Sequence, residues 1–263
     1  MNMKKNKTKV IFAGAGPGDP DLITIKSMNA LKTADLIIYA GSLVPKAVLC
    51  WKGRDTETKS SAGMNLHQII DTIKTYHDEG KKIVRLHTGD PSLYGAIFEQ
   101  MRELEKLNIS YEVIPGVTAA FAASAKMNME YTLPEVTQTL ILTRISGRTP
   151  VPESENLEKL ASHKASMAIY LSIGHAQKVQ QILEKYYGNG SLCAIAYKVS
   201  HPEEKIIYTK IDQLVKTCKD NEITRHALII VGKTVETSLR KNDILKSKLY
   251  DSTFSHGYRD AEK

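Results

Sequence analysis

The stretch VIFAGAGPGDP, residues Val10–Pro20, decides the fold class. Its first four residues are apolar and predict a short buried strand. The seven residues that follow contain three glycines and two prolines. Glycine permits positive φ angles and lets a ligand approach the backbone closely. A tight turn alone does not account for so many turn-forming residues, so we interpret the segment as a strand followed by a ligand-binding loop.

This loop does not fit the common nucleotide-binding motifs. The dinucleotide motif Gly-x-Gly-x-x-Gly would need glycine where Asp19 stands, and Pro17 lacks the amide that could donate to a phosphate. No acidic residue follows the second strand, at Tyr39–Gly41, to hold a ribose. Gly232–Thr234 ends like a Walker A loop, but Ala227 occupies the position of its first glycine. A nicotinamide cofactor and a Walker-type phosphate site are both disfavoured.

Outward from this stretch, apolar strand-like runs alternate with helix-like periodicity along the chain. Further strands are predicted at 36–40, 82–87, 111–114, 139–142, 167–171, 192–197, 206–208 and 228–231, and helices at 22–31, 66–76, 94–107, 117–127, 156–161 and 177–186. This alternation predicts a parallel α/β architecture. A polar, proline-containing break at 131–136 predicts two α/β domains, 1–134 and 135–235. The segment after Lys233 is expected to be irregular, with a peripheral tail at 236–263.

Composition and charge narrow the class of protein. Hydrophobic residues make up 42% and charged residues 25%, as in globular chains. No apolar run approaches the roughly 18 residues of a membrane span. The three cysteines form no CxxC pair and the histidines show no ligand spacing, so we expect neither a disulfide framework nor a metal site, and a cytoplasmic location. The net charge of +7 favours an anionic partner such as nucleic acid, a phosphate or a polycarboxylate.

Two further loops follow predicted strands in the first half of the chain. They are HTGDPSLYG, at His87–Gly95, and PGVTA, at Pro115–Ala119. Ligands of open α/β sheets bind outside the carboxyl ends of the strands. Each loop by itself could be an ordinary strand-to-helix turn, but the three together predict one small-molecule site.

The three loops, in this order, resemble those of the tetrapyrrole (uroporphyrin and corrin) methyltransferases. The resemblance extends over about Val10–Val231. Within the family, several stretches are similar to the branch that methylates carbon 11 of precorrin-4 or cobalt-precorrin-4; they are residues 39–44, 85–91, 94–97, 137–144 and, most specifically, 147–153. Uroporphyrinogen methylases usually show Gly-Gly-Asp-Pro, whereas this chain has Thr88 for the first glycine.

The resemblance implies S-adenosylmethionine as cofactor, S-adenosylhomocysteine as product, and a cofactor site in the cleft between two α/β domains. The cofactor contacts that it implies are Pro17, Thr88, Gly89, Asp90, Tyr94, Thr118, Ala119, Leu171, Tyr197 and Ala227. The chain departs from many relatives directly after Leu171, where it reads Ser-Ile-Gly-His instead of a Ser/Thr-rich segment. We also expect a homodimer.

Three residues are candidates for the reaction itself: His87, Asp90 and Arg144. His87 could act as a general base or contact the tetrapyrrole, although a histidine at a strand end is often only hydrogen-bonded in place. Arg144 and Arg148 could pair with substrate carboxylates, and ordinary salt bridges are the alternative.

The implied reaction is methyl transfer to carbon 11 of an anionic tetrapyrrole in cobalamin biosynthesis. Uroporphyrinogen III or another precorrin is the alternative substrate. Two alternative functions come from other classes of protein: a ribosomal RNA ribose methyltransferase and a non-catalytic cofactor-binding protein. Aromatic residues are only 6% of the chain, which disfavours RNA reading. We therefore expect neither a nucleic acid nor a membrane as partner.

Overall fold

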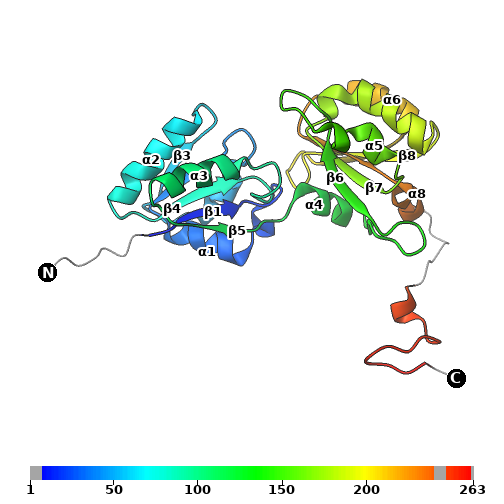
Figure 1. Cartoon of the computed structure of the whole chain (residues 1–263), viewed down its shortest axis with the longest axis horizontal. Helices are drawn as coiled ribbons and strands as arrows, with labels where there is room; N and C mark the ends of the chain where they lie inside the picture. The colour runs from blue at the N-terminus through cyan, green and yellow to red at the C-terminus, as the bar shows by residue number, and fades with distance from the viewer. Residues whose placement is uncertain (1–7, 240–246, 262–263) are drawn as a thin grey trace. The chain divides into compact units, whose positions relative to one another are not determined.

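The computed structural model describes residues 8–239 and 247–261, and its contacts divide the chain into two compact units (Figure 1). Unit 1 holds the residues up to 122 together with the short segment 200–202, and unit 2 holds 123–199 and the residues from 203 onward. Each unit is built on its own five-stranded sheet. Within the described ranges, no helix has the length and apolar character needed to cross a membrane.

The sheet of unit 1 has the strand order β3-β2-β4-β1-β5. Its strands are β1 (Val10–Gly14), β2 (Leu36–Tyr39), β3 (Glu57–Ser60), β4 (Ile83–His87) and β5 (Tyr111–Ile114). All neighbouring pairs are parallel, as the sequence predicts for this half. The sequence does not reveal β3, because its residues Glu-Thr-Lys-Ser include no apolar side chain and it pairs only with β2 at the edge.

Helices cover both faces of this sheet. They are α1 (Ile25–Thr33), α2 (Leu66–Asp78) and α3 (Ile97–Lys106), with 3-10 turns η1 (Pro20–Leu22) and η2 (Lys46–Trp51). The next helix, α4 (Ala119–Lys126), begins in unit 1 and ends in unit 2. Phe12 and Ile38 pack with residues of α2 and α3, whereas Ala13 and Ile37 pack on the side of α1 and η2. Figure 1 shows α2 and α3 on one face and α1 on the other. The alternation follows from successive strand side chains pointing to opposite faces.

The apolar residues spaced by three in the predicted helix 22–31 are Leu22, Ile25, Met28 and Leu31, and the prediction that they form one buried stripe is wrong. Ile25 is 74% exposed and Leu22 lies outside the helix. The buried face of α1 consists of Ser27, Ala30 and Leu31. Small residues on this face let the helix approach the sheet closely.

The sheet of unit 2 has the strand order β6-β7-β10-β8-β9. Its strands are β6 (Leu140–Arg144), β7 (Ser166–Tyr170), β8 (Leu192–Tyr197), β9 (Lys205–Lys210) and β10 (Ala227–Val231). Only β6 and β7 are parallel, while β7–β10, β10–β8 and β8–β9 are antiparallel. The all-parallel arrangement expected from the alternation is therefore wrong for this unit. The segment between β8 and β9 is short enough for a direct reversal, and no crossover helix intervenes.

Helices of unit 2 enclose a second core built around Met167, Ile169, Leu183 and Ile229. The elements are α5 (Leu157–Ala161), α6 (Ala176–Tyr187), α7 (Leu214–Asp220) and α8 (Lys233–Leu239), with turns η3 (Glu153–Glu155), η4 (Ile173–His175) and η5 (Ile211–Gln213). The domain boundary near Pro134 stays a prediction. It falls between α4 and β6, after the last strand of one sheet and before the first of the other.

The expectation of an irregular chain after Lys233 is wrong for α8. Val235 is fully buried, and Thr234 shares a 2.9 Å hydrogen bond with buried Ser166 of β7. A Cβ on Gly232 would lie 2.9 Å from the Ser166 Cα. The Gly-Lys-Thr sequence is therefore explained by packing against β7. Residues 240–246 and 262–263 of the predicted tail lie outside the described residues.

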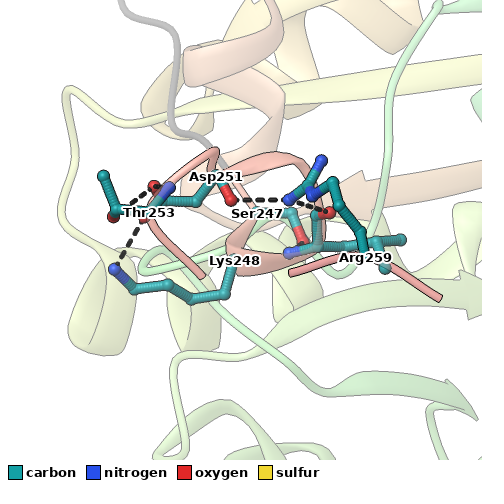
Figure 2. A network of polar contacts seen from close by, with 6 residues as sticks. Ser247, Lys248, Asp251, Thr253 and Arg259 are labelled. Carbon is teal, nitrogen blue, oxygen red and sulfur yellow. Dashed lines mark hydrogen bonds and ion pairs between the residues drawn. The ribbon is translucent and has the colours of Figure 1, made fainter. Parts of the chain in front are cut away.

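The last described segment, 247–261, forms its own polar network (Figure 2). Lys248 Nζ donates to Asp251 over 2.9 Å, and the Thr253 amide and hydroxyl donate to the same carboxylate over 3.0 and 2.7 Å. Arg259 donates to the carbonyl oxygens of Leu249 and Asp251. Ser247 caps the start of the turn η6 (Lys248–Tyr250), and its hydroxyl accepts from the Leu249 amide. These contacts are local to the segment and assign it no ligand.

Candidate functional site

The three loops of unit 1 meet at one edge of its sheet. β1 lies between β4 and β5, so the loops after these strands are neighbours. Gly16 and Gly89 form an antiparallel bridge, in which the Gly89 amide donates to the Gly16 carbonyl over 2.8 Å and the reverse bond measures 3.3 Å. The three sequence segments that predict a small-molecule site therefore lie side by side.

Packing between the loops explains two of the glycines. A Cβ on Gly14 would lie 2.6 Å from both the Gly116 Cα and the Gly89 carbonyl oxygen. A Cβ on Gly116 would lie 2.1 Å from that same oxygen. Gly89 differs, because it has a φ of +60° and its Cβ would meet nothing closer than 3.7 Å, at Thr118. Gly14 and Gly116 therefore let the loops touch, whereas Gly89 is favoured by its positive φ and not by a steric limit.

Asp90 holds the second and third loops together. One carboxylate oxygen accepts from the Gly116 amide over 2.9 Å, and the other accepts from the amide of Ser92 over 2.8 Å and from its hydroxyl. Burial, the largest single effect, raises the pKa of Asp90, but the hydrogen bonds from Ser92 and Gly116 outweigh it, so the pKa is lowered. The carboxylate stays ionised, and both of its oxygens bind groups of the protein. Its predicted contact with the cofactor stays a prediction.

The first loop has partners that the sequence does not reveal. The Asp19 amide donates to the hydroxyl of Ser200 over 2.9 Å, and a Cβ on Gly18 would lie 2.4 Å from the His201 ring. The Trp51 indole donates to the Pro20 carbonyl over 3.1 Å. Segment 200–202 follows β8 in sequence but packs in unit 1. No local pattern in the chain signals this long-range contact.

The other residues expected at the cofactor from unit 1 lie in or beside these loops. Pro17 is buried in the first loop, and Thr88 is partly buried directly after β4. Tyr94 is 42% exposed and has a φ of +58°. Thr118 is buried and Ala119 begins α4. The structure therefore brings this set together along one edge of the sheet.

Beside the loops lies a cavity of about 320 Å³. The end of β4, the loop 88–96, and residues of α2 and α3 line it. His87 lines it with a side chain that is 4% exposed. Burial, followed by the positive charge of Arg85, lowers the pKa of His87 to about 3, while a hydrogen bond to the Gly95 backbone opposes the shift. His87 is neutral at physiological pH, as a proton acceptor must be before it acts.

The residues expected at the cofactor from unit 2 also share one sheet edge. Leu171 directly follows β7, has a φ of +51° and is 57% exposed. Ala227 begins β10, whereas Leu171 follows the end of a strand. Because β10 runs antiparallel to both neighbours, its first residue nevertheless pairs with Tyr197 at the end of β8 and lies at the edge where β7 ends. The antiparallel direction of β10 therefore places Ala227 at the same sheet edge as Leu171 and Tyr197.

The two candidate arginines of unit 2 differ in their environment. Arg144 ends β6, pairs in register with Tyr170, and donates to the Thr149 carbonyl over 3.1 Å. This bond fixes the start of the loop 145–152. Arg148 is exposed at the tip of that loop. An ion pair at such an exposed position contributes at most about 1 kcal/mol.

Two further observations concern residues outside these expectations. Ser172 is fully buried, accepts from the Ile145 amide over 2.9 Å and donates to the Tyr170 carbonyl, so it is a structural residue. Arg85 lies inside β4 and is 5% exposed. A charged residue within the apolar run Ile-Val-Arg-Leu was the signal that could have identified it. Over the described part of the chain, no group of three His, Cys, Asp or Glu residues is placed to hold a metal ion.

Comparison with known proteins assigns the chain to a family. It belongs to the Tetrapyrrole (Corrin/Porphyrin) Methylases, whose match covers residues 9–215. The family predicted from the three loops is therefore confirmed.

The chain is 48% identical to the cobalt-precorrin-4 C(11)-methyltransferase of Methanocaldococcus jannaschii, over 98% of each chain. It is 41% identical to the precorrin-4 C(11)-methyltransferase of Pseudomonas aeruginosa, over 96% of this chain and 99% of the relative. The X-ray structure of a cobalt precorrin-4 methyltransferase, a cobalamin biosynthetic enzyme, superposes with a TM-score of 0.85 and 40% identity. That match covers 89% of this chain and 99% of the other. The two-sheet α/β fold is thus the fold of this family.

Proposed function

We propose that the chain transfers a methyl group from S-adenosylmethionine to carbon 11 of precorrin-4 or cobalt-precorrin-4 in cobalamin biosynthesis. The observation that carries the proposal is the similarity to enzymes of this activity over nearly the whole chain. The packed edge of three loops supports it, because it supplies a built surface for a small molecule. A homodimer in the cytoplasm remains part of the proposal.

The cofactor supplies an electrophilic methyl group on a sulfonium, and the ring carbon of the substrate supplies the electron pair. The protein therefore has to hold and align the reactants rather than generate a strong nucleophile. We assign the position beside Gly89 and Thr118 to the cofactor, because Gly89 has a positive φ and no atom would lie closer than 3.7 Å to a Cβ placed there. Fixed backbone dipoles of these loops stabilise the positive charge without reorganising during transfer.

We assign distinct roles to the three candidate reactive residues. Asp90 fixes the loop that carries Gly89 by binding the Gly116 amide. His87 is neutral and faces the cavity beside this loop, where it contacts the tetrapyrrole. Arg144, held by the Thr149 carbonyl, places the loop 145–152 and orients a substrate carboxylate.

Two successive measurements test this function. Isothermal titration with S-adenosylhomocysteine should show one binding site per chain. The enzyme should then add one methyl group to precorrin-4 or cobalt-precorrin-4, and with a carbon-13-labelled methyl donor the new resonance should lie on carbon 11. Comparing both substrates decides whether the ring carries cobalt.

Uroporphyrinogen III is the control substrate. Methylation of uroporphyrinogen III in preference to precorrin-4 would assign the chain to another branch of the family. Binding of S-adenosylhomocysteine without methylation of any tetrapyrrole would make it a cofactor-binding protein without this activity.

A further inference from the structure

The cavity beside the second loop contains a buried cation. The Arg85 side chain lines it and is 5% exposed. Its Nε donates to Gln100 Oε1 over 3.0 Å and its Nη1 to the Ile38 carbonyl over 3.1 Å. Both acceptors are neutral. Burial lowers the pKa of Arg85 to about 10, so the guanidinium stays charged at neutral pH.

A buried charge is normally compensated by an opposite charge, because removing it from water is costly. Across residues 8–239 and 247–261, no carboxylate forms an ion pair with Arg85. Among the described residues, Glu99 is the only acidic one that lines the cavity, and it is exposed on α3 and therefore screened by solvent. The cavity thus has a net positive interior.

His87 supplies a second unmatched group in the same cavity. It is 4% exposed, and its Nε2 is buried without a hydrogen-bond partner in the described structure. A hydrogen bond to the Gly95 backbone engages the ring from the loop side. Arg85 and His87 are two residues apart on β4, so their side chains point to the same face of the sheet. Tyr94 and Glu99 are the other titratable residues that line the cavity.

We propose that this cavity binds one carboxylate-bearing side chain of the tetrapyrrole, with the carboxylate on Arg85 and His87 Nε2 as the second contact. Gln100 is a positioning residue, which holds the guanidinium through Nε and is itself fixed by its bond to the Ala96 carbonyl. The inference rests on the proposed function for the identity of the ligand. The carboxylate would compensate the Arg85 charge and raise the pKa of His87, so that the ring donates from Nε2.

The decisive pair of variants is Gln100→Glu and Gln100→Met. The first gives Arg85 an internal carboxylate in nearly the same volume, which competes with the ligand. The second removes both amide hydrogen bonds, to Arg85 and to the Ala96 carbonyl, without adding a charge. We expect Gln100→Glu to raise the KM for the tetrapyrrole by about ten- to hundredfold, and Gln100→Met by less than about threefold. Gln181→Glu, on the exposed surface of α6, controls for the change in net charge.

Binding of S-adenosylhomocysteine should be unchanged in all three variants, which shows that they are folded. An equal rise in KM for Gln100→Glu and Gln100→Met would overturn the proposal, because the effect would then be structural. So would an unchanged KM for Gln100→Glu.

A second measurement does not depend on methyl transfer. Propionate should shift the ring resonances of His87 in histidine NMR spectra, saturably and at millimolar concentration, and propionamide should not. The variant His87→Gln assigns the resonances, and the shift should disappear in Gln100→Glu. If propionate shifts His87 while no tetrapyrrole is methylated, the anion site stands and the proposed function fails. If the enzyme methylates precorrin-4 but propionate leaves His87 unaffected, this inference fails alone.

Discussion

Arg85 and His87 show how neighbouring residues on one strand determine each other's protonation. Both side chains face the same buried cavity, and the guanidinium charge adds to the burial that lowers the pKa of His87. Asp90, three residues further on, is in the opposite situation, because amide donors stabilise its negative charge. The second loop thus combines a neutral imidazole with an ionised carboxylate, each fixed by its immediate partners.

The depressed pKa of His87 predicts a specific dependence of stability on pH. The folded pKa is about 3, whereas an unfolded histidine titrates near about 6.5. Between these values the unfolded state binds more protons, so the free energy of unfolding decreases as the pH falls. From pH 7 to about pH 5 this group alone should remove about 2 kcal/mol.

Urea unfolding at several pH values measures this effect. In His87→Gln, the free energy of unfolding should fall by about 2 kcal/mol less between pH 7 and about pH 5 than in the wild type. This difference is independent of how the substitution changes stability at neutral pH. His163→Gln, at an exposed position of unit 2, controls for the loss of an imidazole. The same decrease in the wild type and in His87→Gln would contradict the assignment of a neutral buried ring.

At the scale of elements, the junction of the three loops depends on backbone packing rather than on side chains. The bridge between Gly16 and Gly89 and the bond from the Gly116 amide to Asp90 link loops that are far apart in sequence. Because each loop is anchored to the next, a change in one is transmitted to the whole edge. The position of Gly89 therefore depends on Gly14 and Gly116.

Substitution of Gly116 tests this dependence. In Gly116→Ala the new Cβ would lie 2.1 Å from the Gly89 carbonyl oxygen, so the loops must separate. We expect unfolding free energy to decrease by about 1–3 kcal/mol and the affinity for S-adenosylhomocysteine to decrease as well. Calorimetric titration and urea unfolding measure the two effects.

Gly63→Ala is the matched control in the same unit. Its Cβ would meet nothing within 4 Å, so both quantities should remain near wild type. Wild-type cofactor affinity in Gly116→Ala would show that the junction does not shape the cofactor site.

At the scale of the whole molecule, the two units have separate cores, and the chain as a whole has an excess of positive charge. The net charge of +7 attracts a polycarboxylate substrate over longer distances than any single contact. The cofactor lacks this attraction, because S-adenosylmethionine carries a net positive charge and S-adenosylhomocysteine carries none.

Ionic strength therefore distinguishes the two ligands. Raising salt from about 0.05 to 0.5 M shortens the screening length several-fold, so the KM for the tetrapyrrole should increase several-fold. The affinity for S-adenosylhomocysteine, measured in the same buffers, should change much less. If the KM for the tetrapyrrole does not change with salt, the net charge does not attract the substrate over long distances, and only short-range contacts with residues such as Arg85 remain.

The sequence by itself determined the family, the strands of unit 1 that carry the loops, and most residues at the two sheet edges. Apolar runs followed by glycine-rich turns are local signals, because a strand end and its turn are encoded by adjacent residues. The positions of His87, Asp90 and Thr118 followed directly from those runs. The edge strand β3 lacked this signal, since its exposed residues are all polar or charged.

Tertiary structure decided what depends on distant partners. The direction of β10 is fixed by its pairing with β7 and β8, and this pairing places Ala227 beside Tyr197 although it begins a strand. The buried face of α1 could not be read from a three-residue spacing, because an α-helix has about 3.6 residues per turn and such positions drift around the helix. Arg85 became a candidate binding residue only when folding enclosed it without a carboxylate partner among the described residues, because the cost of a buried charge depends on its surroundings and not on its neighbours in sequence.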